Sequence, residues 1–191
     1  PYSSDYKIGL SKDLKILAYE TTFYQNAGAS ADLSPAVMVR TLFHGTNSYF
    51  IPNVKMTAYS CKTNLPPNTA FRGFGGPQGM FVIESALSHA AKELSISTHK
   101  LQKINLLKDG NEFPYGQIAD GVELNSIWEK MESKFDIETI EKEINDFNAN
   151  HSDMKKGFSL MPVTFGISFT KTPMNQARAL VHIYTDGSVG V

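Results

Sequence analysis

Cysteine is almost missing from this sequence of 191 residues, in which Cys61 is the single example. One cysteine cannot build a disulfide framework and argues against a cysteine-ligated zinc site, so we expect a protein of a reducing, cytoplasmic compartment. The sequence also contains no apolar run near the roughly 18 residues that a membrane-spanning helix needs. These features exclude a disulfide-stapled secreted scaffold and predict no membrane partner.

An excess of charge of one sign is also missing. The sequence has 18 Lys and Arg residues against 19 Asp and Glu residues, which gives a net charge of −1. This balance excludes a strongly basic nucleic-acid-binding protein, so we expect no nucleic acid as partner. The five histidines form no His-x-x-x-His pair, and the sequence therefore predicts no metal site built from protein ligands.

The hydrophobic pattern predicts a fold that begins and ends with strands and has helices in the middle. A hydrophobic fraction of 41% over 191 residues suits one domain with a sizeable core. Strand-type residues and alternation predict strands at residues 6–10, 14–26, 53–63, 163–169 and 177–185. This order favours an α+β fold over alternating β-α-β units.

Four or five helices are expected between these strands. Ser34 with Pro35 suits a helix start, and apolar residues from Met80 to Leu94 recur at helical spacing. Residues 97–108 predict a third helix with Gly110 as its stop, and Ser126 opens a fourth with a capping box. A further helix carries Ile137, Ile140, Ile144 and Phe147.

The C-terminal residues predict a hairpin that is not finished. Asp186-Gly187 is a strong two-residue turn after the strand at 177–185, and residues 188–191 begin the returning strand. The first residue, Pro1, is not a methionine. We therefore expect residues 1–191 to be part of a domain excised from a longer chain.

The most unusual stretch is the glycine-rich loop Arg72-Gly73-Phe74-Gly75-Gly76-Pro77, which opens the helix around Met80. Glycines let backbone N–H groups approach an anion, the helix N-terminus adds partial positive charge, and an arginine adds a bidentate cation. The loop is not a Walker motif, because no Lys-Ser or Lys-Thr follows it. A tight turn that only connects a strand to a helix is the alternative interpretation.

Two further side chains have both a structural and a functional interpretation. Phe74 lies between glycines, so its ring could meet a planar ligand or could anchor the loop as a hydrophobic plug. Arg40 lies among apolar residues of the first helix, where it could extend to solvent or face a pocket as a held cation. The residues alone leave both questions open.

Four stretches taken together resemble the molybdenum-binding large domain of the xanthine dehydrogenase/aldehyde oxidase family. The stretch NTAFRGFGGPQ at residues 68–78 is specific, and the others follow the family's order and spacing from about Tyr6 to the last residue. The similarity is closer to the xanthine dehydrogenase branch. The other stretches are RTLFH at 40–44, CKTNLP at 61–66, and FGISF at 165–169 with YTDGSV at 184–189.

The resemblance implies an enzyme that hydroxylates purines, converting hypoxanthine and xanthine to urate, at molybdenum held by molybdopterin. It implies that Arg72 lies against this cofactor, that Phe74 meets the substrate ring, and that Arg40 binds a purine oxygen and stabilises charge on the ring as a catalytic residue. Electrons would leave through 2Fe-2S clusters and FAD on other domains or subunits, and we expect the complete parent to be an oligomer. Arginine at position 40 favours purines over aldehydes, since aldehyde oxidases generally lack it.

The resemblance also implies that part of the site lies outside this stretch. The family's substrate-facing glutamate and its general-base glutamate would lie before Pro1 and after Val191, and no Glu here matches either position. We therefore expect the isolated chain to be inactive, with one wall of a site that needs several. The alternatives are an aldehyde oxidase-type hydroxylase and a non-catalytic scaffold that keeps the fold.

Overall fold

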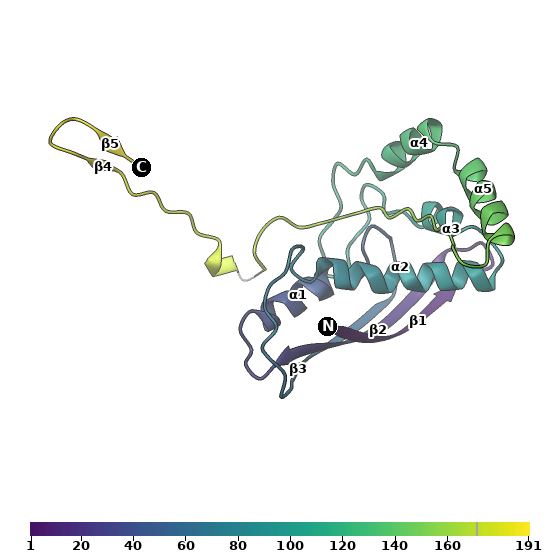
Figure 1. The fold of residues 1–191 in the computed structure, drawn as a ribbon, viewed down its shortest axis with the longest axis horizontal. Coiled ribbons are helices and arrows are strands. Elements are labelled where there is room, and N and C mark those ends of the chain that lie inside the picture. Colours follow the sequence, from purple (N-terminus) through teal and green to yellow (C-terminus); the bar gives the residue numbers. More distant parts are fainter. Residues whose placement is uncertain (171) are drawn as a thin grey trace.

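The computed structural model describes residues 1–170 and 172–191. Its order of elements confirms the α+β prediction, with strands at both ends and five helices between them (Figure 1). The strands are β1 (Tyr2–Leu10), β2 (Ile16–Gly28), β3 (Val54–Lys62), β4 (His182–Ile183) and β5 (Val189–Gly190). The helices are α1 (Ser34–Phe43), α2 (Gly76–Glu93), α3 (Thr98–Ile104), α4 (Leu124–Lys134) and α5 (Ile137–Asn150), with a 3-10 turn at Thr172–Met174.

The main sheet has the order β1-β2-β3. β1 and β2 form the predicted antiparallel hairpin, whereas β3 pairs with β2 in parallel. A parallel neighbour needs a crossover connection, and α1 supplies it. The order of elements predicted from the sequence favoured an α+β fold over β-α-β units. The structure nevertheless contains one such unit, β2-α1-β3, inside the α+β fold.

Helix α2 lies along one face of the sheet and forms most of the core with it (Figure 1). Met80, Ile83 and Leu87 are buried, as their helical spacing predicts. The prediction fails at Leu94, which is about half exposed because the helix ends at Glu93. Among the described residues, no helix is long and apolar enough to cross a membrane.

Three predicted helix starts or ends were wrong by a few residues. Ser34 does not cap α1; its hydroxyl donates to the Asn68 carbonyl 2.9 Å away. α3 ends at Ile104, well before Gly110, because its C-terminal cap is Asn105. α4 begins at Leu124, so Ser126 lies inside the helix and donates to the Glu123 carbonyl instead of forming a capping box.

The strand predicted at residues 163–169 was wrong as an element, although this segment is extended. Among the described residues its backbone bonds only to side chains, such as those of Arg40 and His44, and no backbone–backbone hydrogen bond joins it to another strand. Just before the segment, the Gln102 amide donates to the Leu160 carbonyl and the Asn47 amide donates to the Pro162 carbonyl. The strand predicted at 177–185 is limited to His182–Ile183, which pairs with β5 across the predicted Asp186-Gly187 turn.

Candidate functional site

Helices α1 and α2 approach each other closely where the glycine-rich loop ends. A Cβ atom on Gly75 would lie 2.1 Å from the Val37 carbonyl oxygen, and one on Gly79 would lie 2.5 Å from the Thr41 carbonyl oxygen. The Thr41 hydroxyl adds a hydrogen bond of 3.0 Å to the Gly75 carbonyl. The tight-turn interpretation of the loop therefore has a physical basis, because these glycines bring two helices together.

The loop nevertheless presents Phe74 in an unusual backbone conformation. Phe74 has a φ of 50°, between Gly73 at 86° and Gly75 at 99°. A non-glycine residue in this left-handed region is uncommon and costs on the order of 1 kcal/mol, and such strain clusters at functional sites. The arrangement turns the Phe74 ring toward Phe169, with ring centroids 5.1 Å apart at an angle of 60°.

Arg40 does not extend to solvent. The residue is only 5% exposed, and its Nη1 donates to the Gly166 carbonyl at 2.5 Å while Nη2 donates to the Ser168 carbonyl. Its Nε is buried and has no hydrogen-bond partner among the described residues. Burial lowers the pKa of the Arg40 guanidinium from its ordinary value, although arginine remains charged in proteins. The Arg40 guanidinium is therefore a buried cation with at least one N–H donor, on Nε, that has no partner among the described residues.

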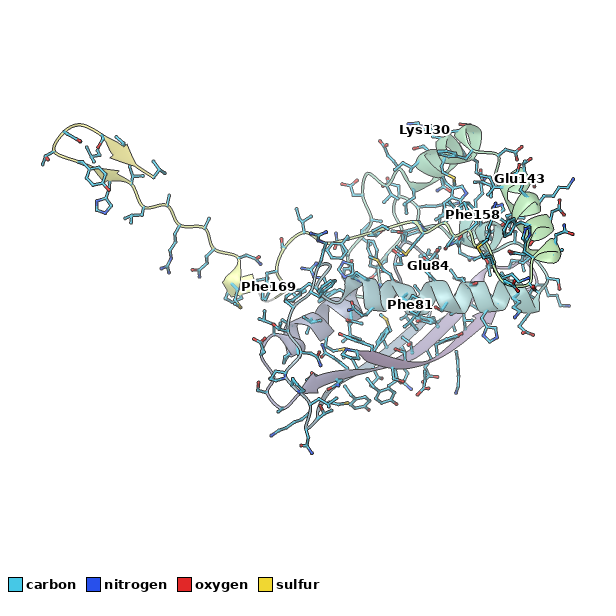
Figure 2. The ribbon with its side chains drawn as sticks, in the orientation of Figure 1. Phe81, Glu84, Lys130, Glu143, Phe158 and Phe169 are labelled. Carbon is cyan, nitrogen blue, oxygen red and sulfur yellow. The ribbon has the colours of Figure 1, made fainter. Side chains whose placement is uncertain are left out.

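Arg40 and Phe74 meet the same short stretch of chain. Arg40 binds the Ser168 carbonyl, and Phe74 packs against the ring of the next residue, Phe169. Figure 2 shows Phe169 near the N-terminal end of α2, apart from Phe81 further along that helix. The sequence did not single out Phe169 as a site residue, because the alternation around it predicted only a strand.

His44 connects Arg40 to the same segment. Its Nδ1 donates to the Arg40 carbonyl at 2.9 Å, and its Nε2 accepts from the Gly166 N–H at 2.9 Å. An Nε2 that accepts must be unprotonated, so the ring is neutral here. Burial lowers the pKa of His44, and the neighbouring Arg40 charge lowers it further, while the hydrogen bond to the Arg40 carbonyl acts in the opposite direction. The ring also packs against Phe165, with centroids 4.7 Å apart.

The lowered pKa of His44 predicts a loss of stability in mild acid. In the unfolded chain the imidazole binds a proton below about pH 6.5, whereas the folded protein resists protonation until a lower pH. The free energy of unfolding should therefore fall as the pH drops from 6.5 through the folded pKa, by about 1.4 kcal/mol for each tenfold difference in proton affinity between the two states. Denaturant unfolding of the wild type and of His44→Gln over this range measures it. Gln keeps a donor and an acceptor without titrating, so parallel curves for the two proteins would contradict the prediction.

Arg72 lies in different surroundings from Arg40 and Phe74. It is exposed and lines a cavity of about 710 Å³ between β1 and α2, which neither Arg40 nor Phe74 lines. Gln78 also lines this cavity, and its Oε1 is buried with no partner among the described residues. The structure therefore brings Arg40 and Phe74 to one stretch of chain and places Arg72 on a separate cavity. The cavity walls also include Tyr2, Ser4, Tyr6, Phe71, Pro77, Phe81, Val82 and Ser85.

The cavity has the features of a site for an organic cofactor. Its volume lies within the range of about 300–1,000 Å³ typical of small-molecule sites. An unpartnered buried acceptor favours a ligand that brings N–H groups, and Arg72 favours an anionic or polar edge. Within residues 1–170 and 172–191, no group of three or more His, Cys, Asp or Glu residues is arranged to hold a metal ion.

Comparison with known proteins agrees with these features. A family model described as the molybdopterin cofactor-binding domain matches residues 1–106, and a second model with the same description matches residues 130–191. The chain is 45% identical over 189 residues to the xanthine dehydrogenase/oxidase of Gallus gallus, covering 99% of this chain and 14% of that protein. It is 41% identical over 191 residues to a nicotinate hydroxylase of Emericella nidulans, with 99% and 14% covered.

Solved structures show the same fold. The aldehyde oxidoreductase from Desulfovibrio desulfuricans is 25% identical to this chain and has a TM-score of 0.69, covering 76% of this chain and 16% of that one. The quinoline 2-oxidoreductase from Pseudomonas putida, at 19% identity, has a TM-score of 0.67 over 78% of this chain and 20% of that one. The chain thus spans about one seventh of the length of the curated relatives it matches.

Proposed function

Because this chain belongs to the molybdopterin cofactor-binding domain family, we propose that it forms one wall of the active site of a xanthine dehydrogenase-type molybdenum hydroxylase that acts on purines. The observation that carries the proposal is the convergence of Arg40 and Phe74 on Ser168 and Phe169. A buried cation and a pair of rings at one place suit a planar, electron-accepting heterocycle. The relatives named xanthine dehydrogenase support the choice of purines.

Arg40 stabilises negative charge on the substrate in this proposal. Nucleophilic attack on a purine carbon builds negative charge on the ring and its oxygen, and a cation held in place beforehand stabilises that charge most in the transition state. The carbonyls of Gly166 and Ser168 fix the guanidinium without consuming all five of its N–H donors. Arg40 is therefore the catalytic residue that this chain contributes.

Phe74 and Phe169 orient the substrate in this proposal. Their rings already meet edge to face, and each such aromatic contact is worth about 0.5–1.5 kcal/mol beyond the area buried. A flat heterocycle could take the place of one ring against the other. The strained φ of Phe74 keeps its ring at the loop tip, which fits a positioning role.

Arg72 and Gln78 would hold the molybdopterin cofactor. The orphaned Gln78 Oε1 can accept from an N–H group of the pterin, and Arg72 can bind its polar edge. When bound, the cofactor supplies the metal centre at which oxygen is transferred to the substrate carbon. We propose that the rest of the parent protein carries 2Fe-2S clusters and FAD and assembles as an oligomer.

Turnover by the complete parent protein tests the proposal. The purified protein should contain molybdenum and should oxidise hypoxanthine and xanthine with a higher kcat/KM than nicotinate or an aromatic aldehyde. Nicotinate is included because a nicotinate hydroxylase is 41% identical to this chain. A preference for the aldehyde would favour the aldehyde oxidase alternative, and a well-folded protein without molybdenum would favour the non-catalytic scaffold.

A further inference from the structure

Glu84 of α2 is a partly buried carboxylate that accepts hydrogen bonds from three neutral side chains. Its Oε1 accepts from the Asn47 amide at 2.8 Å and from the Tyr49 hydroxyl at 2.7 Å. Its Oε2 accepts from the Gln102 amide at 2.7 Å. Burial raises the pKa of Glu84 above its ordinary value, while the three hydrogen bonds act in the opposite direction because each stabilises the ionised form.

The two amides that bind Glu84 also bind the extended segment, residues 160–169. The Asn47 nitrogen donates its second N–H to the Pro162 carbonyl at 2.7 Å, and the Gln102 nitrogen donates its second N–H to the Leu160 carbonyl at 2.8 Å. An amide nitrogen has two N–H groups, so both amides use all their donors. Asn47 is 2% exposed and Gln102 is 1% exposed, which leaves little access for water to replace these bonds.

The carboxylate of Glu84 determines which way the two amides point. An ionised carboxylate only accepts hydrogen bonds, so each amide must turn its nitrogen toward it. In this orientation the Asn47 oxygen accepts from the Thr164 N–H at 3.3 Å, which adds another bond to the extended segment. A reversed amide would place its oxygen against a backbone carbonyl oxygen, where no hydrogen bond forms. Glu84 therefore maintains the links that join α2 to the extended segment.

The extended segment leads to the side chains of the proposed substrate site. Two of its carbonyls hold the Arg40 guanidinium, and Phe169 at its end meets the Phe74 ring with centroids 5.1 Å apart. Phe74 lies in the loop that opens α2, the helix that carries Glu84. Figure 2 shows Glu84 on this helix and Phe169 near its N-terminal end. One ring is thus attached to α2 directly, and the other belongs to a segment that α2 holds through Glu84.

We propose that Glu84 is a positioning residue of the substrate site. Through the Asn47 and Gln102 amides it places the extended segment, so that Phe169 stands at the correct distance from Phe74. This inference rests on the proposed function, in which these two rings orient the substrate. A displacement of about 1 Å caused by a change far from the chemistry can lower turnover about 10²-fold, so a residue outside the site can control it.

The variant Glu84→Gln of the complete parent protein tests the proposal, because it replaces one oxygen with an NH₂ group at nearly constant size. The new amide accepts through one oxygen only, so it cannot bind both Asn47 and Gln102 in their present orientations. One of them must turn, which breaks its bond to the Pro162 or the Leu160 carbonyl. We expect kcat/KM for xanthine to fall by about tenfold to 10²-fold.

A small aliphatic aldehyde provides the internal reference for this variant. It has no ring for Phe74 and Phe169 to orient, so its kcat/KM should change far less. The xanthine-to-aldehyde ratio of kcat/KM does not depend on how much of the enzyme is folded or loaded with cofactor. A fall of about tenfold or more in this ratio supports the proposal. An unchanged ratio would show that Glu84 contributes to stability alone.

Two control variants separate positioning from stability. Tyr49→Phe removes one donor to Glu84 but leaves both amides bonded to the extended segment, so it should lower the thermal midpoint without changing the ratio. Glu93→Gln makes the same substitution at the end of α2, where the side chain is 74% exposed, and should change neither quantity. A ratio lowered as much by Tyr49→Phe as by Glu84→Gln would overturn the proposal.

Gln102→Met keeps the test available if Glu84→Gln does not fold. Methionine has a similar size but no amide, so this variant removes the link between Glu84 and the Leu160 carbonyl while the carboxylate stays in place. We expect the xanthine-to-aldehyde ratio to fall here as well. A ratio equal to that of the wild type would overturn the proposal.

Hydrogen exchange of the same parent proteins tests the proposal without turnover. In Glu84→Gln, the amides of Thr164 and Gly166 should exchange about tenfold or more faster than in the wild type, because the extended segment loses a link to α2. Glu93→Gln should match the wild type. Unchanged exchange across residues 160–168 would overturn the proposal whether or not the parent oxidises purines. Faster exchange in a parent that does not oxidise xanthine would contradict the proposed function alone and would support the placement of the segment by Glu84.

Discussion

Replacing Arg40 with methionine in the complete enzyme should lower kcat for xanthine by about 10²–10³-fold, the loss that follows removal of one preorganised donor to a developing charge. Methionine keeps much of the length and the apolar stem of arginine but has no charge. In the structure the Arg40 guanidinium is buried and fixed by two carbonyls, so water cannot easily replace it. Steady-state kinetics with xanthine measures the effect.

An aromatic aldehyde serves as the internal control for the same variant. Arg40 also holds residues 166–168 against α1, so its loss could disturb the site without any direct role in substrate binding. A direct role predicts that aldehyde turnover changes far less than xanthine turnover. An equal loss for both substrates, with a lowered thermal midpoint, would show that Arg40 acts only through the fold.

Replacing Gly79 with alanine should destabilise the fold by about 1–3 kcal/mol, as expected for an atom forced into a packed contact. Gly79 lies inside α2 with an ordinary helical backbone, where alanine would otherwise add about 1 kcal/mol of helix stability. The new Cβ, however, would lie 2.5 Å from the Thr41 carbonyl oxygen and 3.3 Å from the Gly45 nitrogen. Both are backbone atoms, so the helices themselves must separate.

Gly157→Ala is the matched control for this prediction. A Cβ at Gly157 meets no atom within 4 Å, and its backbone is not left-handed. The control should therefore stay within about 0.5 kcal/mol of the wild type, the range of ordinary surface substitutions. Denaturant unfolding of the three proteins provides the comparison. A Gly79→Ala variant more stable than the wild type would show that α1 and α2 are not in close contact in solution.

Local sequence patterns were sufficient for the elements whose partners lie close in the chain. The β1–β2 hairpin pairs across a short turn, and α2 shows its buried side through the spacing of Met80, Ile83 and Leu87. The motif at residues 68–78 likewise identified the family, later confirmed by the match to the molybdopterin cofactor-binding domain. These features depend on the spacing and the identity of residues, and both can be read directly from the sequence.

Tertiary structure alone decided where Arg40 lies and what becomes of residues 163–169. The alternation around Phe165 predicts a half-buried strand, but the groups that bind this segment come from residues more than 100 positions earlier. Arg40 and His44 bind backbone groups of Gly166 and Ser168 that a neighbouring strand could otherwise pair with. The Phe165 ring packs against His44, whereas Ile167 is left exposed. The periodicity of a sequence indicates which residues share a face. It does not indicate what that face packs against, because those contacts come from segments that are distant in sequence and are brought together only by the fold.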